Sequence, residues 1–321
     1  MQVTDRGPIP PDDLIIRIGV SADHYTTGDE RAEVFRSVGC AGYQDIVSAL
    51  PPDWTWAGRR VLDFGCGSGR ILRWFAPHID DGMTLVGCDV HEPTIAWTRD
   101  AYPGVEIYAS AAMPPLPEPD GSFDLIYCGS VFSHLTDWAP WLLEMRRLLK
   151  PGGLLVASIH GLGLWSQGTA GARGEPWDDA ATGLLIEHYG AGFEDSWGPA
   201  VYASEWWLRE YWGRALEIVR YEPSGFAHPS DRGVGQALVA ARRREDQDAL
   251  EAGDLLRVSD DPRELAAAVR GQRLAYEEVA VHLAKIALLW RDAQAFPELW
   301  QRLHEAKERV AELEAELTQR S

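Results

Sequence analysis

A short apolar segment that runs directly into a glycine-rich turn places the strongest constraint on the fold of this chain of 321 residues. Residues 61–70 read VLDFGCGSGR, in which Gly65, Gly67 and Gly69 alternate with other residues before a helix-like segment begins. Glycine at these positions lets the backbone pass close to a ligand, and amide N–H groups at the start of a helix can face that ligand. The segment therefore predicts a strand–turn–helix unit with a binding site at the carboxyl end of the strand.

Further strand-like runs alternate with helix-length segments, which is typical of a parallel sheet with crossover helices. The first five runs are RVLDFG (60–65), TLVGCDV (84–90), VEIYAS (105–110), FDLIYCGS (123–130) and GLLVASIHG (153–161). Two later runs, LEIVRYEP (216–223) and GQALVAARR (235–243), can complete the sheet as an antiparallel pair. The chain is thus predicted to form a Rossmann-like, doubly wound α/β fold with seven strands, mostly parallel, and an antiparallel last strand.

The pattern divides the chain into three regions. Residues 1–58 are expected to form an N-terminal helical cap, and residues 59–245 the α/β domain, with an irregular insertion at residues 162–203 on the acceptor side of the site. In the cap, a helix near residues 29–50 is expected to turn inward a stripe formed by Val34, Val38, Ile46 and Leu50. Residues 246–321 form a helical C-terminal element.

Two apolar series in this C-terminal element step by three or four residues, as heptads do. The first is Leu265, Val269, Tyr276, Val279, Leu283, Ile286 and Trp290, and the second is Leu299, Leu303, Ala306, Val310, Leu313 and Leu317. The second series spans only about two and a half heptads, so a long rod is not expected. The pattern predicts a helical hairpin or a dimeric coiled coil, and we expect a homodimer formed through these helices.

The charge balance argues against polyanionic partners. There are 49 Asp and Glu residues against 30 Lys and Arg residues, a formal net charge of −19. Such a chain repels nucleic acid and anionic membrane surfaces, so neither is expected as a partner. Eleven of the acidic residues lie between residues 74 and 145 beside the single basic residue Arg99. A neutral or cationic small molecule, or a glycan, is therefore the expected partner.

Neither the first residues nor the cysteines suggest export from the cell. The start of the chain lacks a basic leader with an apolar core, and no apolar run approaches the roughly 18 residues of a membrane span. The four cysteines, Cys40, Cys66, Cys88 and Cys128, form no CxxC pair and no metal-binding spacing. We expect a cytoplasmic protein with reduced thiols and no bound metal.

An acidic residue at the end of the second strand indicates that the glycine turn binds a nucleoside. Asp89 follows the turn by about twenty residues, where a carboxylate can accept hydrogen bonds from both ribose hydroxyls. A nicotinamide dehydrogenase also combines a glycine-rich turn with an acidic residue that binds the ribose, but its turn reads Gly-x-Gly-x-x-Gly. Here the third glycine comes one residue earlier, and Asp63 stands two residues before the first.

This arrangement resembles the class I S-adenosylmethionine-dependent methyltransferases, whose first motif reads Asp-x-Gly-x-Gly-x-Gly. Three further segments resemble the family in order and spacing, namely DGSFDLI (120–126), SVFSHL (130–135) and EMRRLLKPGG (144–153). The resemblance covers about residues 59–161 and implies S-adenosyl-L-methionine as the cofactor. It places Asp63 and the glycines at the methionine end and Asp89 at the ribose.

The family commonly reads adenine with an acidic residue after the third strand, but this chain has Ala109-Ser110-Ala111-Ala112 there. Ser110 or backbone groups must then replace that acid. The full set of residues that the resemblance assigns to the cofactor is Asp63, Gly65, Cys66, Gly67, Gly69, Asp89, Val90, Ser110, Ala111, Gly129 and Ser130.

Histidines follow the fourth and fifth strands, where open α/β sheets bind ligands. The Asn/Asp-Pro-Pro-Tyr tetrad typical of amine methylation on bases is absent after the fourth strand, and Ser133-His134 stands there instead. A neutral imidazole can remove the proton from a hydroxyl acceptor, so His134 and His160 are the candidate catalytic residues. The alternative is that each imidazole only orders a loop.

Aromatic residues are frequent after the fifth strand, where the superfamily builds acceptor specificity. They are Trp165, Trp177, Trp197, Trp206, Trp207 and Trp212. Phe132, Trp165 and Trp206 are the candidate substrate-binding residues, because aromatic faces suit sugars and flat polyketide-like rings. Packing in the core is the competing interpretation for each of them.

The Ile-Pro-Pro element near the start, Pro114-Pro115-Leu116 and His160-Gly161 resemble a bacterial subgroup of sugar and natural-product methyltransferases. This resemblance implies O-methylation of a sugar, a glycan or a glycosylated natural product. Three alternatives stay open: N-methylation of an amino sugar or another small amine, other chemistry with the same cofactor, and a non-catalytic interaction subunit.

Overall fold

The computed structural model describes residues 7–17, 28–166, 169–187, 199–226, 235–245, 249–289 and 296–320. At its centre is a seven-stranded sheet with the order β3-β2-β1-β4-β5-β9-β8. These strands are β1 (Arg60–Phe64), β2 (Thr84–Asp89), β3 (Glu106–Ala109), β4 (Phe123–Cys128), β5 (Leu149–Ile159), β8 (Glu217–Phe226) and β9 (Gln236–Arg242).

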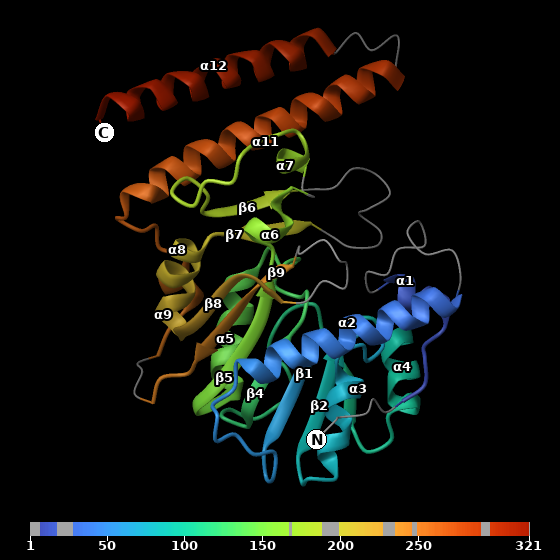
Figure 1. The fold of residues 1–321 in the computed structure, drawn as a ribbon. Coiled ribbons are helices and arrows are strands. Elements are labelled where there is room, and N and C mark those ends of the chain that lie inside the picture. Colours follow the sequence, from blue (N-terminus) through green and yellow to red (C-terminus); the bar gives the residue numbers. More distant parts are fainter. Residues whose placement is uncertain are drawn as a thin grey trace.

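Strand directions agree with the sequence-based prediction. The pairs β1–β2, β1–β4, β2–β3 and β4–β5 are parallel, whereas β9 is antiparallel to both β5 and β8. Among the described strands of this sheet, β9 alone therefore runs against the others. The predicted seven-stranded, mostly parallel sheet with an antiparallel last strand is confirmed (Figure 1).

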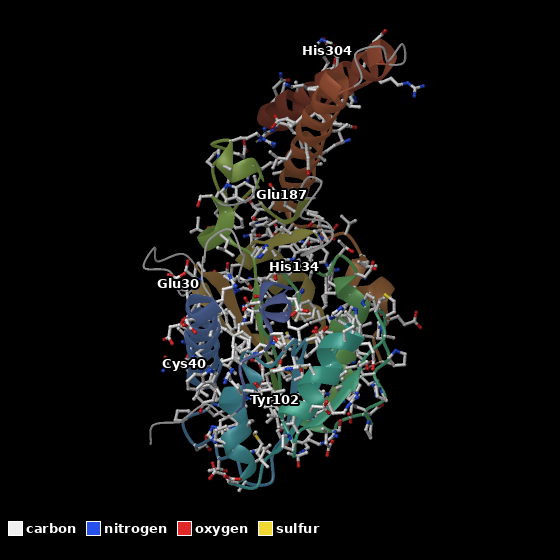
Figure 2. The ribbon with its side chains drawn as sticks, turned by 90° about the vertical axis from the view of Figure 1, so that its right-hand side faces the viewer. Glu30, Cys40, Tyr102, His134, Glu187 and His304 are labelled. Carbon is white, nitrogen blue, oxygen red and sulfur yellow. The ribbon has the colours of Figure 1, made fainter. Side chains whose placement is uncertain are left out.

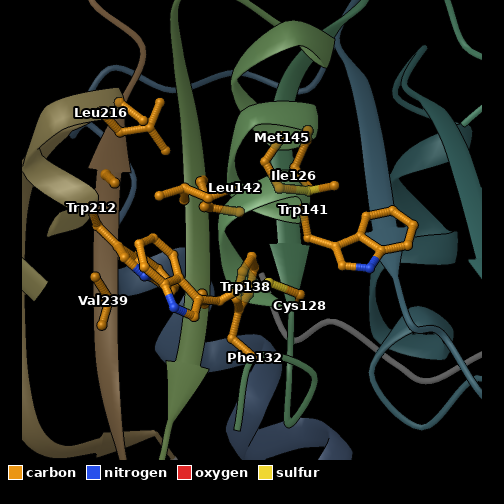
Figure 3. Packing of buried hydrophobic residues seen from close by; sticks show 14 of the residues in the cluster. Ile126, Cys128, Phe132, Trp138, Trp141, Leu142, Met145, Trp212, Leu216 and Val239 are labelled. Atoms are coloured by element: carbon orange, nitrogen blue, oxygen red, sulfur yellow. The ribbon is translucent and has the colours of Figure 1, made fainter. Parts of the chain in front are cut away.

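Both faces of the sheet are covered, which explains why its strands read as nearly continuous apolar runs. Neighbouring residues of a strand point to opposite faces, so Leu62 and Ile126 enter one core cluster while Val61 and Leu125 enter the other. The first face packs against α5 (Trp138–Leu148), α8 (Glu205–Trp207), the π-helical turn η2 (Leu208–Trp212), α9 (Gly213–Ala215) and α10 (Ala252–Leu256). Figure 3 shows the tryptophans of α5 and η2 in this layer.

The second face packs against α2 (Gly28–Ser48), α3 (Leu72–Phe75), η1 (Ala76–Ile79) and α4 (Glu92–Ala101), and α1 (Asp12–Arg17) lies against α2. The expected stripe on the buried side of α2 is only partly confirmed: Ile46 is buried, but Val34 and Val38 are only half-buried, whereas Phe35 is buried. Glycines set this side: a Cβ atom on Gly39 would lie 1.9 Å from the Arg70 carbonyl oxygen. A stripe of apolar residues alone could not reveal this close approach.

The insertion contributes α6 (Leu162–Trp165), α7 (Thr169–Ala172) and a two-stranded antiparallel sheet of β6 (Leu184–Glu187) and β7 (Ala200–Ala203). Strand β7 is joined to the main sheet region by two backbone hydrogen bonds. The Ala203 N–H donates to the His160 carbonyl (3.0 Å) and the Val201 N–H to the Ser133 carbonyl (2.7 Å). The insertion is thus fixed directly at the ends of β4 and β5.

The tail forms α11 (Pro262–Leu289) and α12 (Phe296–Arg320), and α12 runs back along α11 above the insertion (Figure 1). Val310 of α12 is buried, as are Val269 and Leu274 among the α11 side chains that the structure describes. Of the first predicted series, however, Leu265 and Val279 remain 53% and 46% exposed. Among the described residues, no helix is both long and apolar enough to span a membrane.

Candidate active site

A pocket of about 280 Å3 lies at the carboxyl ends of β1, β2 and β4. Nine of the residues expected at the cofactor line it, namely Asp63, Gly65, Cys66, Gly67, Asp89, Val90, Ser110, Gly129 and Ser130. Gly69 and Ala111 are not part of its lining. A Cβ atom on Gly69, where φ is +81°, would lie 2.7 Å from the Tyr102 ring, so this glycine serves helix packing.

The glycine turn lets the backbone come close to the pocket, but three of its N–H groups form hydrogen bonds within the protein. The N–H groups of Gly65 and Cys66 both donate to the Cys88 carbonyl (2.8 and 2.9 Å), and the Gly67 N–H donates to Asp89 Oδ2 (3.0 Å). These three amides are therefore already satisfied within the protein. A pyrophosphate needs such donors, and these three are already engaged.

Asp89 is held rigidly at the end of β2. Its Oδ2 atom accepts from Gly67 as described, and Oδ1 accepts from the His91 N–H (3.0 Å). Each carboxylate oxygen can accept a further hydrogen bond, as a ribose diol requires. Next to it, the Val90 side chain lines the pocket and is 59% exposed, which provides an apolar surface against which a nucleobase can pack.

Asp63 is only 3% exposed, and its Oδ2 atom has no hydrogen-bond partner within the described structure. Burial raises its pKa to about 8, an effect that the Tyr127 hydroxyl opposes and the nearby Asp89 carboxylate increases. The Arg70 guanidinium lines the same pocket, and burial lowers the pKa of Arg70 to about 10. A buried acid with a vacant acceptor beside a cavity is suited to a cationic group.

The two candidate histidines form a pair. Their ring centroids are 5.3 Å apart with perpendicular planes, and His134 lines the pocket whereas His160 lies behind it at 6% exposure. His134 Nδ1 lies 2.9 Å from the Pro199 carbonyl oxygen, which assigns the proton to Nδ1 and leaves Nε2 as an acceptor. In Figure 2, His134 lies between Glu187 of the insertion and Tyr102 of the α/β core.

Burial keeps both imidazoles neutral. It lowers the pKa of His134, an effect that the contact with Pro199 opposes, and it lowers the pKa of His160 to about 3 with a further contribution from His134. His160 is neutral throughout the ordinary pH range. His134 is thus the histidine placed to exchange a proton with a molecule in the pocket.

The three aromatic residues expected at the substrate do not line this pocket. Phe132 is fully buried against Trp212, with ring centroids 4.6 Å apart, and Trp206 is 7% exposed beneath the guanidinium of Arg263. Trp165 packs against the Tyr202 ring, which in turn contacts His160. Trp207 and Trp212 belong to the core, and Trp197 lies outside the described residues.

The tail holds the insertion through a buried guanidinium. Arg270 of α11 lies 5.6 Å from the Trp165 ring and bonds to Glu175 (3.2 Å), the Thr182 hydroxyl and the Pro176 carbonyl. A continuous row of rings therefore connects α11 to the pocket, formed by Trp165, Tyr202, His160 and His134.

Several pocket residues were not expected from the sequence, above all Arg70, Leu135 and Trp141. Arg70 follows the glycine turn directly, so its position in the motif could have revealed it. Trp141 comes from α5 and reaches the pocket beside Phe64, at a ring centroid distance of 4.8 Å, which only tertiary packing determines. Across the described ranges, no group of three or more His, Cys, Asp or Glu residues is placed to hold a metal ion.

The buried Asp63 carboxylate with a vacant acceptor and the Asp89 carboxylate with remaining acceptor capacity, on one open α/β sheet, are compatible with S-adenosyl-L-methionine, which carries an ammonium group and a ribose. The comparison with known families agrees, because residues 62–157 match the family model of a methyltransferase domain. This segment is a class I S-adenosylmethionine-dependent methyltransferase domain, and S-adenosyl-L-methionine is its cofactor.

Among its relatives is a probable S-adenosylmethionine-dependent methyltransferase of Mycolicibacterium smegmatis, 38% identical over 102 residues that make up 32% of this chain and 38% of that protein. Another, from Mycobacterium tuberculosis, is 32% identical over 170 residues, or 48% of this chain and 54% of that protein. The ubiquinone biosynthesis O-methyltransferase of Pseudomonas aeruginosa is 31% identical over 106 residues, or 32% of this chain and 44% of that protein. The chain thus spans about half or less of the length of these relatives.

Proposed function

We propose that this chain transfers a methyl group from S-adenosyl-L-methionine to a hydroxyl group of a small molecule, with a sugar, a glycan or a glycosylated natural product as the acceptor class. The observation that carries the proposal is the position of His134. It shares one pocket with Asp63 and Asp89, and its Nδ1 proton is directed to the Pro199 carbonyl.

Each of several pocket residues binds a different part of the cofactor. Asp63 accepts from the ammonium group, Arg70 pairs with the carboxylate and Asp89 accepts from the ribose hydroxyls. Val90 contacts the adenine face, and Ser110 replaces the acidic residue that relatives use at the adenine edge. When bound, S-adenosyl-L-methionine supplies an electrophilic methyl group on a sulfonium centre. Alignment of the acceptor is then the main task of the protein.

His134 has the properties of the base for a hydroxyl acceptor. Its Nε2 atom carries no proton, and the lowered pKa keeps the imidazole neutral. His134 can therefore take the proton from the hydroxyl group that is methylated. His160 stays neutral behind it, so no second positive charge opposes protonation of His134. The acidic excess on the cofactor half adds a preference for neutral or cationic acceptors over phosphorylated ones.

The test is a screen of glycosylated acceptors by mass spectrometry for the gain of one methyl group. We expect turnover with the wild-type protein, and a loss of about 100-fold or more for His134→Gln, as for removal of a general base. His304→Gln is the matched control, because His304 is exposed on α12. A His134→Gln variant that retains most of its turnover would instead indicate N-methylation, since a neutral amine needs no base.

We also propose that two copies pair through α11. Leu265 and Val279 are two heptads apart and exposed on this helix, with the exposed Gln272 midway between them. Light scattering after size-exclusion chromatography should show a dimer that Val279→Glu converts to a monomer. A monomeric wild type would contradict this proposal without affecting the enzymatic one.

A further inference from the structure

One residue at the pocket has a backbone conformation that its side chain disfavours. Ser130 follows β4 and has a φ of 60°, and among the described residues it is the one non-glycine residue with positive φ. Such a conformation costs free energy and persists only where surrounding contacts enforce it. Conformations of this kind concentrate at functional sites, and Ser130 lines the cofactor pocket.

A closed ring of three hydrogen bonds enforces the conformation. The Ser130 N–H donates to Ser158 Oγ (2.7 Å), the Ser158 hydroxyl donates to Gln236 Oε1 (2.5 Å), and Gln236 Nε2 donates to Ser130 Oγ (3.0 Å). Ser158 lies on β5 and is completely buried, and Gln236 is the first residue of β9. Three adjacent strands therefore fix one residue of the pocket wall.

The turn that Ser130 begins carries two functional parts of the site. Val131 packs against the glycine turn so closely that a Cβ atom on Gly65 would lie 2.4 Å from Val131 Cγ2. The Val131 carbonyl in turn accepts from the His134 N–H (2.9 Å). A change of backbone conformation at Ser130 would therefore move both the wall beside the cofactor turn and the loop that bears His134.

We propose that Gln236 and Ser158 are positioning residues, which hold Ser130 in its left-handed conformation and thereby set the cofactor wall and the position of His134. The part that concerns His134 rests on the proposed function. The part that concerns the cofactor wall depends only on cofactor binding. Neither Gln236 nor Ser158 lines the pocket, so both act through Ser130.

A double-mutant cycle with S-adenosylhomocysteine as the calorimetric probe tests this inference. Strain of the usual size predicts that Gln236→Leu weakens binding about tenfold. In a Ser130→Gly background the same change should cost less than about twofold, because glycine adopts positive φ without support. Gln44→Leu, on the exposed surface of α2, is the matched control and should leave the affinity unchanged.

Additive effects in the cycle, or an unchanged affinity for Gln236→Leu, would overturn the inference. Should Gln236→Leu fail to fold, Ser158→Ala replaces it in the same cycle, because it removes the acceptor of the Ser130 N–H and the donor to Gln236 Oε1. The imidazole NMR signals of His134 should shift in the single variant and return in the double variant. A wild type that binds S-adenosylhomocysteine but methylates no acceptor would overturn the proposed function and leave this cycle intact.

Discussion

The two ends of the site are built in different ways. At the cofactor end, one strand–turn–helix unit and the end of the next strand supply Asp63, Gly65, Gly67 and Asp89 within 27 residues of chain. At the end that we propose binds the acceptor, His134 and His160 are backed by aromatic rings of the insertion and by a helix that follows about a hundred residues later. Local backbone geometry thus forms the first end, and long-range packing forms the second. Apart from the turn that Ser130 begins, which contacts both ends, perturbations of one end should therefore leave the other largely intact.

The largest effect is expected at Asp89. In Asp89→Ala, the ribose loses its acceptors and the N–H groups of Gly67 and His91 lose theirs. Hydrogen bonds to a charged group contribute about 1.5–3 kcal/mol each, so the loss of two should lower the affinity for S-adenosylhomocysteine by at least about 100-fold. Calorimetric titration measures it, with the exposed Asp100→Ala as control. Undiminished binding would refute the ribose assignment.

At the end that we propose binds the acceptor, the largest effect is expected for Arg270. In Arg270→Met, Glu175 loses one of its two guanidinium partners, and the Thr182 hydroxyl and Pro176 carbonyl lose their donor. Because this pair is mostly buried, the free energy of unfolding should fall by about 2–3 kcal/mol, slightly less than for a fully buried pair. Hydrogen exchange should increase in β6 and β7.

The affinity of Arg270→Met for S-adenosylhomocysteine should nevertheless stay within about twofold of the wild type, because no cofactor residue depends on α11. Arg302→Met, on the exposed surface of α12, is the matched control. A large loss of cofactor affinity in the Arg270 variant would show that the two ends are coupled.

The raised pKa of Asp63 predicts how the stability of the protein depends on pH. Its folded-state pKa is about 8, against an ordinary value of 3.8, so the folded protein binds more protons than the unfolded chain between these values. The free energy of unfolding without cofactor should therefore fall as pH rises from about 4 to 8, by up to about 1.4 kcal/mol per unit. Thermal melts of wild type and Asp63→Asn should differ in this slope. Parallel pH profiles would contradict the assignment.

The smallest effect is expected for Trp206. In Trp206→Phe, part of a buried ring and its contact with Arg263 are lost, which should reduce the free energy of unfolding by about 1 kcal/mol. Cofactor affinity and methyl transfer should not change, because Trp206 packs in the core outside the pocket. An increase in KM for the acceptor at unchanged stability would restore Trp206 as a substrate-binding residue.

Much of the fold could be predicted because short apolar runs and strand–turn–helix spacing are local properties. The seven strands and most of the cofactor lining follow from runs of a few residues each. A sequence pattern could not show which hydrogen-bond partner each backbone group has. The N–H groups of Gly65 and Cys66 in the glycine turn, for example, donate to Cys88 on the neighbouring strand. The inner side of α2 was predicted only in part, because close approach at Gly39 leaves no apolar signal.

The sequence by itself indicated the class of cofactor, because Asp63, the glycine turn and Asp89 lie on adjacent elements that short segments of the chain specify. Only the tertiary structure decided which side chains reach the pocket and which are buried behind it. It separated His134 from His160, brought Trp141 to the pocket and assigned Trp206 to the core. It also brought Gln236 to Ser130 across 106 residues of chain. Such contacts depend on how the strands are ordered in the sheet, and no short segment carries that information.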